Sequence, residues 1–158
     1  MKHLIYSLLL LTLITSCKQD VLTTTPLASL SITNTIVGGA DAKLRGEPLT
    51  TIYNNGTGYF SLLTGSQDLY VYPQADSLHP YYHSNNKEMM NAGQIYSLFL
   101  GGTLDAVTSL LVHENEFTER DNNIRVRIVN LSPGCPPINV SLSTSTSVNE
   151  FSEIDFAE

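Results

Sequence analysis

The sequence predicts an all-β fold, an antiparallel β-sandwich that follows an N-terminal signal segment. Short stretches in which apolar and polar residues alternate recur along the chain, and this period of two is typical of half-buried strands. Clusters of glycine, asparagine, serine and proline separate these stretches, as turns separate the strands of a sandwich. No helical pattern of useful length follows the signal segment, so strands are expected to supply the core.

Residues 1–16 have the composition of an export signal, with a basic start and an apolar run over residues 4–14. The run is too short for a membrane-spanning helix, which needs about 20 apolar residues. It ends in the letters ITSC at Cys17, and this motif resembles the lipobox of bacterial lipoproteins. The resemblance implies that lipid is attached to Cys17 and that residues 1–16 are removed. The alternatives are an ordinary signal peptide with a chance cysteine and a buried N-terminal strand.

A lipid anchor at Cys17 predicts a protein of the cell envelope. Several acyl chains on one residue hold a protein firmly to a membrane, whereas a single chain binds only marginally. Residues 17–26 then form the lipidated cysteine and a polar tether. In bacterial lipoproteins an aspartate after the cysteine often causes retention in the inner membrane, and Lys18 stands there instead. The outer membrane of a Gram-negative bacterium is therefore the expected location.

Charge and cysteine content narrow the possible partners. The chain has 158 residues and a net charge of −7, which suits one domain and argues against a nucleic-acid partner. Cys17 and Cys135 are its two cysteines. With Cys17 lipidated, Cys135 has no partner within the chain. Cys135 is therefore expected to be buried or covered, or to pair with another chain.

The strand patterns are spread over the whole chain behind the tether. An Asn-Gly pair at residues 55–56 supplies the positive φ angles of a tight hairpin, and Pro73 ends another strand. A weaker strand is expected around residues 87–90. The clear patterns cover residues 28–38, 49–53, 59–63, 69–73, 94–102, 107–115, 124–132 and 138–144.

Residues 122–143 read NNIRVRIVNLSPGCPPINVSLS and resemble the opening of a repeat in the family called domain of unknown function 4397. Residues 51–73 are similar to the hairpin of that repeat, and residues 90–102 to its alanine-glycine turn and the strand that follows. The resemblance implies an exported or lipid-anchored protein with an immunoglobulin-like sandwich and no established activity. It implies a module over residues 27–119 and the start of a second, incomplete module over residues 122–158.

No catalytic or nucleotide-binding fingerprint is present in the sequence. The prediction is a protein that is not an enzyme and has no cofactor and no metal. Two alternatives remain open. One is a metal site at His79 and His83, or a hydrolase that uses these two residues together with His113. The other is a calcium site made by the acidic residues that follow His113.

Four tyrosines form the candidate ligand surface: Tyr70, Tyr72, Tyr81 and Tyr82. Tyr70 and Tyr72 are two apart on one strand and therefore share a face. Aromatic rings stack on sugars or peptides, and the hydroxyl adds a polar contact; the alternative is that these rings pack the edge of the sandwich. The expected function is a non-catalytic binding or structural module with a protein or glycan partner. The second candidate is a glycan-binding accessory protein that uses this tyrosine surface.

Overall fold

The computed structural model describes residues 25–114 and 126–157. Within these two ranges all regular structure is β-strand, as predicted, and no helix occurs. The search for a helix able to cross a membrane accordingly found none in those ranges. The predicted signal segment and Cys17, which belong to residues 1–24, and the connector at 115–125 lie outside the described residues.

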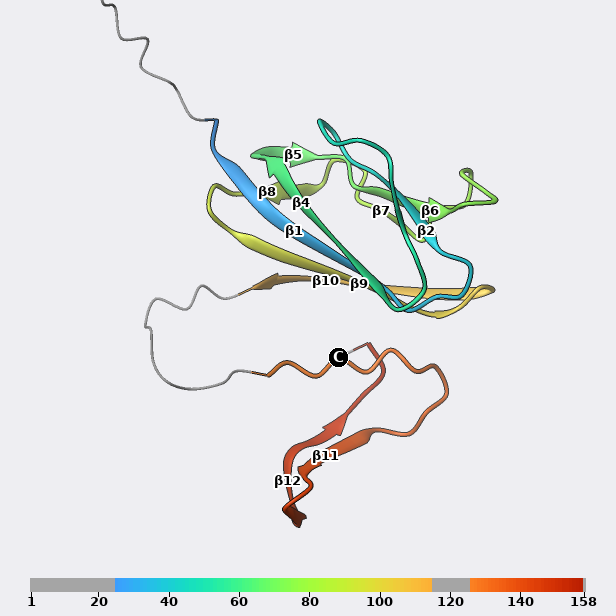
Figure 1. The fold of residues 1–158 in the computed structure, drawn as a ribbon, viewed down its shortest axis with the longest axis vertical. Coiled ribbons are helices and arrows are strands. Elements are labelled where there is room, and N and C mark those ends of the chain that lie inside the picture. Colours follow the sequence, from blue (N-terminus) through green and yellow to red (C-terminus); the bar gives the residue numbers. More distant parts are fainter. Residues whose placement is uncertain (1–24, 115–125, 158) are drawn as a thin grey trace, which may run out of the picture.

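The first sheet has the strand order β10-β9-β1-β4. β1 lies in its interior, antiparallel to β4 on one side and parallel to β9 on the other (Figure 1). The purely antiparallel arrangement expected from the sequence is therefore wrong for the β1–β9 pair, because β9 returns to the first sheet only after the chain has crossed to the second. The strands are β1 (Leu27–Asn34), β4 (Gly56–Leu63), β9 (Ile95–Thr103) and β10 (Ala106–Glu114).

The second sheet has the order β3-β2-β6-β7 and packs across from the first (Figure 1). All of its pairs are antiparallel. A short antiparallel pair, β5 with β8, adds to the same body, and β8 confirms the weak strand expected near residue 88. The strands are β2 (Ala40–Lys43), β3 (Thr50–Ile52), β5 (Gly65–Gln67), β6 (Tyr70–Pro73), β7 (Tyr82–His83) and β8 (Glu88–Met90).

The core fills the space between the two sheets. Along β1 every second side chain is buried, and the serines and threonines between them face outward. Both sheets contribute large apolar side chains that are almost fully buried, and each stabilises the fold by about 1.5–3 kcal/mol relative to an exposed position. The largest apolar side chains that are fully buried are those of Leu30, Ile32, Ile36, Leu62, Leu69, Val71, Met90, Leu98 and Leu100.

One polar side chain, Asn34 at the end of β1, is buried in this core. Its Nδ2 donates to the carbonyl oxygen of Ile52 at 3.1 Å and to that of Ile36 at 3.4 Å. Its Oδ1 accepts from the backbone N–H of Ile36 at 2.9 Å. Since Ile52 belongs to β3, Asn34 joins the first sheet to the second by a hydrogen bond.

The described C-terminal residues form a separate hairpin, β11 (Ile138–Leu142) with β12 (Ser145–Ile154), which projects away from the sandwich (Figure 1). The segment before it lies against the first sheet. The backbone N–H of Gly102 donates to the carbonyl oxygen of Leu131 at 3.3 Å, and Arg127 pairs with Glu114 at 2.7 Å. Gly101 permits this approach, because a Cβ there would come within 2.5 Å of the Leu131 Cβ.

The prediction of a strand at 124–132 is wrong for residues 126–132, the described part, because they form no ladder with another strand. Its backbone makes isolated bonds instead: the Leu131 carbonyl accepts from Gly102, and the Asn130 carbonyl accepts from the N–H of Ala157. The contacts with the sandwich come from Arg127 and Leu131, whereas Val126 of the alternating pattern is exposed.

Cys135 is exposed, so the expectation that it is buried or covered is wrong. It lies in a turn closed by its own N–H, which donates to the carbonyl oxygen of Ser132 at 3.3 Å. Prolines on its C-terminal side keep this turn out of the hairpin.

Candidate functional site

A row of three side chains crosses the outer face of the second sheet. Lys43 on β2 lies directly opposite Tyr70 on β6, and Tyr70 lies directly opposite His83 on β7. Residues paired in this way point to the same face, which here is the face away from the core, because the neighbouring partners Ala42 and Val71 are buried. Tyr72 is on the same face and extends the row along β6.

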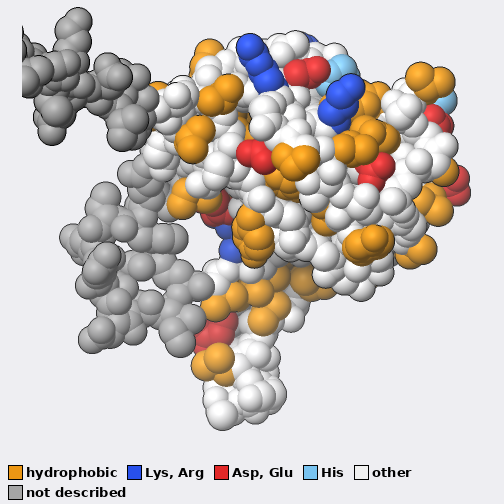
Figure 2. Space-filling view, turned by 45° about the horizontal axis from the view of Figure 1, so that its top comes forward, with side chains coloured by type: hydrophobic (Ala, Val, Ile, Leu, Met, Phe, Trp, Pro, Cys, Tyr) orange, Lys and Arg blue, Asp and Glu red, His pale blue; other side chains and the backbone are white. Residues whose placement is uncertain are grey.

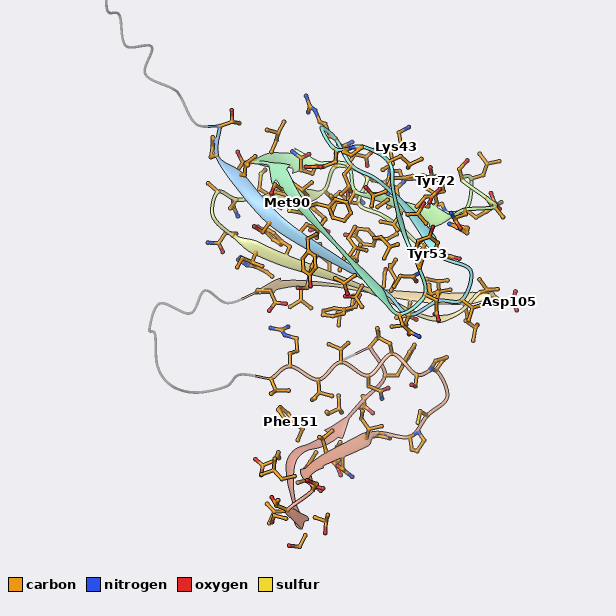
Figure 3. All side chains as sticks on the ribbon, viewed as in Figure 1. Lys43, Tyr53, Tyr72, Met90, Asp105 and Phe151 are labelled. Atoms are coloured by element: carbon orange, nitrogen blue, oxygen red, sulfur yellow. The ribbon has the colours of Figure 1, made fainter. Side chains whose placement is uncertain are left out.

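This row borders an open hollow of about 370 Å³. The hollow lies at the end of β2, where the chain turns toward β3. Lys43 and Tyr72 lie on the side of the molecule opposite the C-terminal hairpin (Figure 3). The side chains that line the hollow are Lys43, Leu44, Arg45, Asp68, Tyr70 and His83.

The Tyr70 ring is held in place from three directions. The His83 ring meets it edge to face, with centroids 4.7 Å apart and an interplanar angle of 87°. The Tyr72 ring lies 5.4 Å away at 46°. The Tyr70 hydroxyl donates to the carbonyl oxygen of Ser77 at 2.5 Å. A ring fixed in this way loses little freedom when a ligand stacks on it.

Charge in the hollow is mixed, with an excess of basic groups. His83 Nε2 lies 2.9 Å from Asp68 Oδ1, so this carboxylate has a partner within the site. Lys43 and Arg45 form no ion pair with another described residue. Basic, acidic and histidine side chains gather at the top of the view in Figure 2.

The four predicted tyrosines do not form one surface. Tyr70 and Tyr72 are brought together as expected. Tyr82 lies opposite the buried Val71 and packs against the core, as does Tyr81. The Tyr82 hydroxyl donates to Glu88 Oε1 at 3.2 Å. Burial raises the pKa of both phenols, and the Glu88 carboxylate raises that of Tyr82 further.

The histidines named as possible ligands belong to different pairs. His79 Nδ1 lies 2.6 Å from Asp76 Oδ2, and this hydrogen bond lowers the pKa of the exposed Asp76 carboxyl. His113 contacts Gln94 and stacks on Tyr96 with centroids 4.9 Å apart. In residues 25–114 and 126–157, no group of three or more histidine, cysteine and acidic side chains could hold a metal ion. The acidic residues of the calcium alternative beyond position 114 lie outside the described residues.

Sequence reasoning missed the basic side of the hollow. The sequence analysis predicts no strand for residues 40–47, which read ADAKLRGE, whereas residues 40–43 form β2. One signal was available: Lys43 and Arg45 alternate with Ala42 and Leu44, which are buried, and this period of two predicts that both basic residues share the outer face.

Comparison with known proteins places the chain in a family. A search of curated protein sequences gave no match. Among solved structures, the C-terminal domain of AlgF from P. aeruginosa is similar with a TM-score of 0.41 and 12% identity, over 56% of this chain and 99% of that domain. A family model described as domain of unknown function (DUF4397) matches residues 31–141, from within β1 to within β11. Because this match covers more than half of the sequence, the chain belongs to the DUF4397 family.

Proposed function

We propose that this protein is a cell-envelope lipoprotein whose β-sandwich is a non-catalytic binding module. The observation that carries the proposal is the open hollow beside Tyr70. It combines a concave surface, an aromatic ring in a fixed orientation and polar groups at its rim, which is the usual make-up of a ligand site. Membership of a family of β-rich domains without an assigned reaction is consistent with binding.

The anchor in this proposal is lipid on Cys17, joined to the module by the tether at residues 17–26. The tether leads directly into β1, which begins at Leu27. Such an arrangement holds the module close to the membrane, since about ten residues span at most about 35 Å when fully extended. The proposed membrane is the outer membrane, because Lys18 follows the cysteine.

Replacement of Cys17 with alanine is expected to block maturation and to move the protein out of the membrane fraction, because the thiol that accepts the lipid is lost. Membrane fractionation and the mass of the mature chain measure this. Cys135→Ala is the matched control and should leave both unchanged, since Cys135 is exposed far along the chain. A Cys17→Ala protein with normal mass and membrane association contradicts the anchor.

The second candidate function is glycan binding, with the module serving as an accessory protein. The tilted pair of Tyr70 and Tyr72 on one exposed face favours it, since aromatic faces of this kind stack on sugar rings. The Tyr70 ring supplies the fixed platform at the edge of the hollow, and Tyr72 extends the platform along β6.

Tyr72→Ala is expected to weaken binding to any glycan identified on an array by about tenfold, the effect of losing about 1.4 kcal/mol of stacking. Titration calorimetry with the array hit measures the change. Tyr59→Ala is the control, because Tyr59 is 81% exposed on β4 of the other sheet. Equal affinities for the wild-type protein and the Tyr72→Ala variant would rule out this face, and an array without any hit would rule out glycan binding.

A further inference from the structure

Basic charge is concentrated at the hollow although the chain is acidic. The net charge is −7, and Lys43, Arg45 and Lys87 are the basic residues between positions 25 and 114. Two of these three line the same hollow. The basic residues Lys43 and Arg45 are therefore clustered at the hollow and not spread evenly over the surface.

The local fold aims both side chains to the same side. Leu44, between them, is 4% exposed and anchors the end of β2 in the core. The N–H of Glu47 donates to the Leu44 carbonyl oxygen at 3.2 Å and closes the turn that carries Arg45. Alternation about the buried Leu44 leaves Lys43 and Arg45 exposed.

The two basic groups have no ion-pair partner among the described residues, whereas the acidic group in the hollow has a hydrogen-bond partner. Asp68 is engaged by His83 at 2.9 Å. Asp41, on the same face of β2, accepts a hydrogen bond from the Thr51 hydroxyl at 2.7 Å and is not part of the hollow's lining. Both cations line the hollow without an ion-pair partner among the described residues, and an oxyanion bound between them would supply one.

We infer that the hollow binds an anionic saccharide, a sugar that carries a carboxylate or sulfate group, with the oxyanion on Lys43 and Arg45 and the sugar ring on Tyr70. This inference deepens the proposed function and rests on it. The Arg45 guanidinium suits two-point binding of a planar oxyanion, and the Lys43 ammonium adds a mobile donor. Tyr70 lines the same hollow as both basic residues, so its ring is the aromatic group nearest to hand for a sugar bound there.

The test uses the detergent-solubilised full-length protein and three probes in titration calorimetry: tetragalacturonate, its carboxyl-reduced neutral form, and a sulfated galactose tetrasaccharide. Binding of a charged probe is expected to be about tenfold or more tighter than binding of the neutral form, and to weaken as sodium chloride is raised. Comparison of the carboxylated with the sulfated probe identifies which oxyanion is preferred.

Matched variants distinguish binding at the hollow from a general electrostatic attraction between the probe and the protein. The double variant Lys43→Gln/Arg45→Gln is expected to lose about tenfold or more in affinity for the preferred charged probe. Lys87→Gln removes the same kind of charge outside the hollow's lining and should stay within about twofold of wild type. Thermal unfolding of each variant shows whether its fold is intact, and the salt dependence of the wild-type protein tests the inference without any substitution.

Equal binding of the neutral and charged probes, an unaffected double variant, or no binding of either charged probe overturns the inference. These results leave the proposed function standing if a neutral glycan binds and Tyr72→Ala weakens it. Loss of all glycan binding, with normal membrane anchoring, removes the glycan hypothesis together with the inference but leaves the lipoprotein anchor intact.

Discussion

Replacing Asn34 with alanine is expected to lower the free energy of unfolding by about 2–4 kcal/mol, because buried backbone groups lose their hydrogen-bond partner. The Ile36 N–H and the Ile52 carbonyl oxygen both depend on the Asn34 amide at 2.9 and 3.1 Å. Neither group can turn to solvent, since Ile36 is 1% and Ile52 4% exposed. Urea denaturation of the wild-type and variant proteins measures the difference.

Asn54→Ala is the matched control. Its Nδ2 also donates to a backbone oxygen, that of Thr35 at 2.9 Å, but the pair is exposed. Water replaces the lost partner there, so a change below about 1 kcal/mol is expected. If the two alanine variants are equally stable, the hydrogen bond between the sheets does not carry the energy assigned to it.

Gly102→Ala is expected to destabilise the protein by about 3 kcal/mol or more, because a left-handed φ and a backbone clash act together. Gly102 has φ of +94°, and a Cβ there would lie 2.3 Å from the carbonyl oxygen of Ala106. Ala106 begins β10, so relief of the clash requires the β9–β10 hairpin to move. The same shift would disturb the bond from the Gly102 N–H to Leu131, which helps to hold the C-terminal segment.

Gly65→Ala separates the two causes. Gly65 has φ of +103°, close to that of Gly102, but no atom lies within 4 Å of its would-be Cβ. Only the conformational penalty of about 1–2 kcal/mol applies. Thermal and urea unfolding should therefore rank the wild type first, Gly65→Ala second and Gly102→Ala last, and equal losses for the two variants would exclude the clash as a cause.

Some of the strands could be predicted because their burial alternates. β1 shows this clearly, with Leu30 and Ile32 buried and the residues between them facing outward. The parallel pairing of β1 with β9 could not be predicted, since a period of two is the same for either direction of the partner strand. β12 was missed because its residues are exposed along most of its length and leave no alternation to detect.

The site could be predicted only in part for a similar reason. Tyr70 and Tyr72 lie on a regular strand, so their spacing determined a shared face. Tyr82 follows the irregular residues 74–81, and across such a segment the register of β7 against β6 cannot be derived from spacing. Asp68 belongs to the site because it pairs with His83. The fold brings these two residues together, and no local sequence pattern indicates it.

The position of β1 also determines how late the sandwich can close. Ser31 on β1 bonds to Ser97 on β9, 66 residues further along the chain, and contacts of such sequence separation make folding slow. β4 can cover one side of β1 early, but the other side presents unsatisfied backbone groups until β9 has arrived. A chain that is still incomplete therefore carries an open strand edge that a neighbouring chain can pair with.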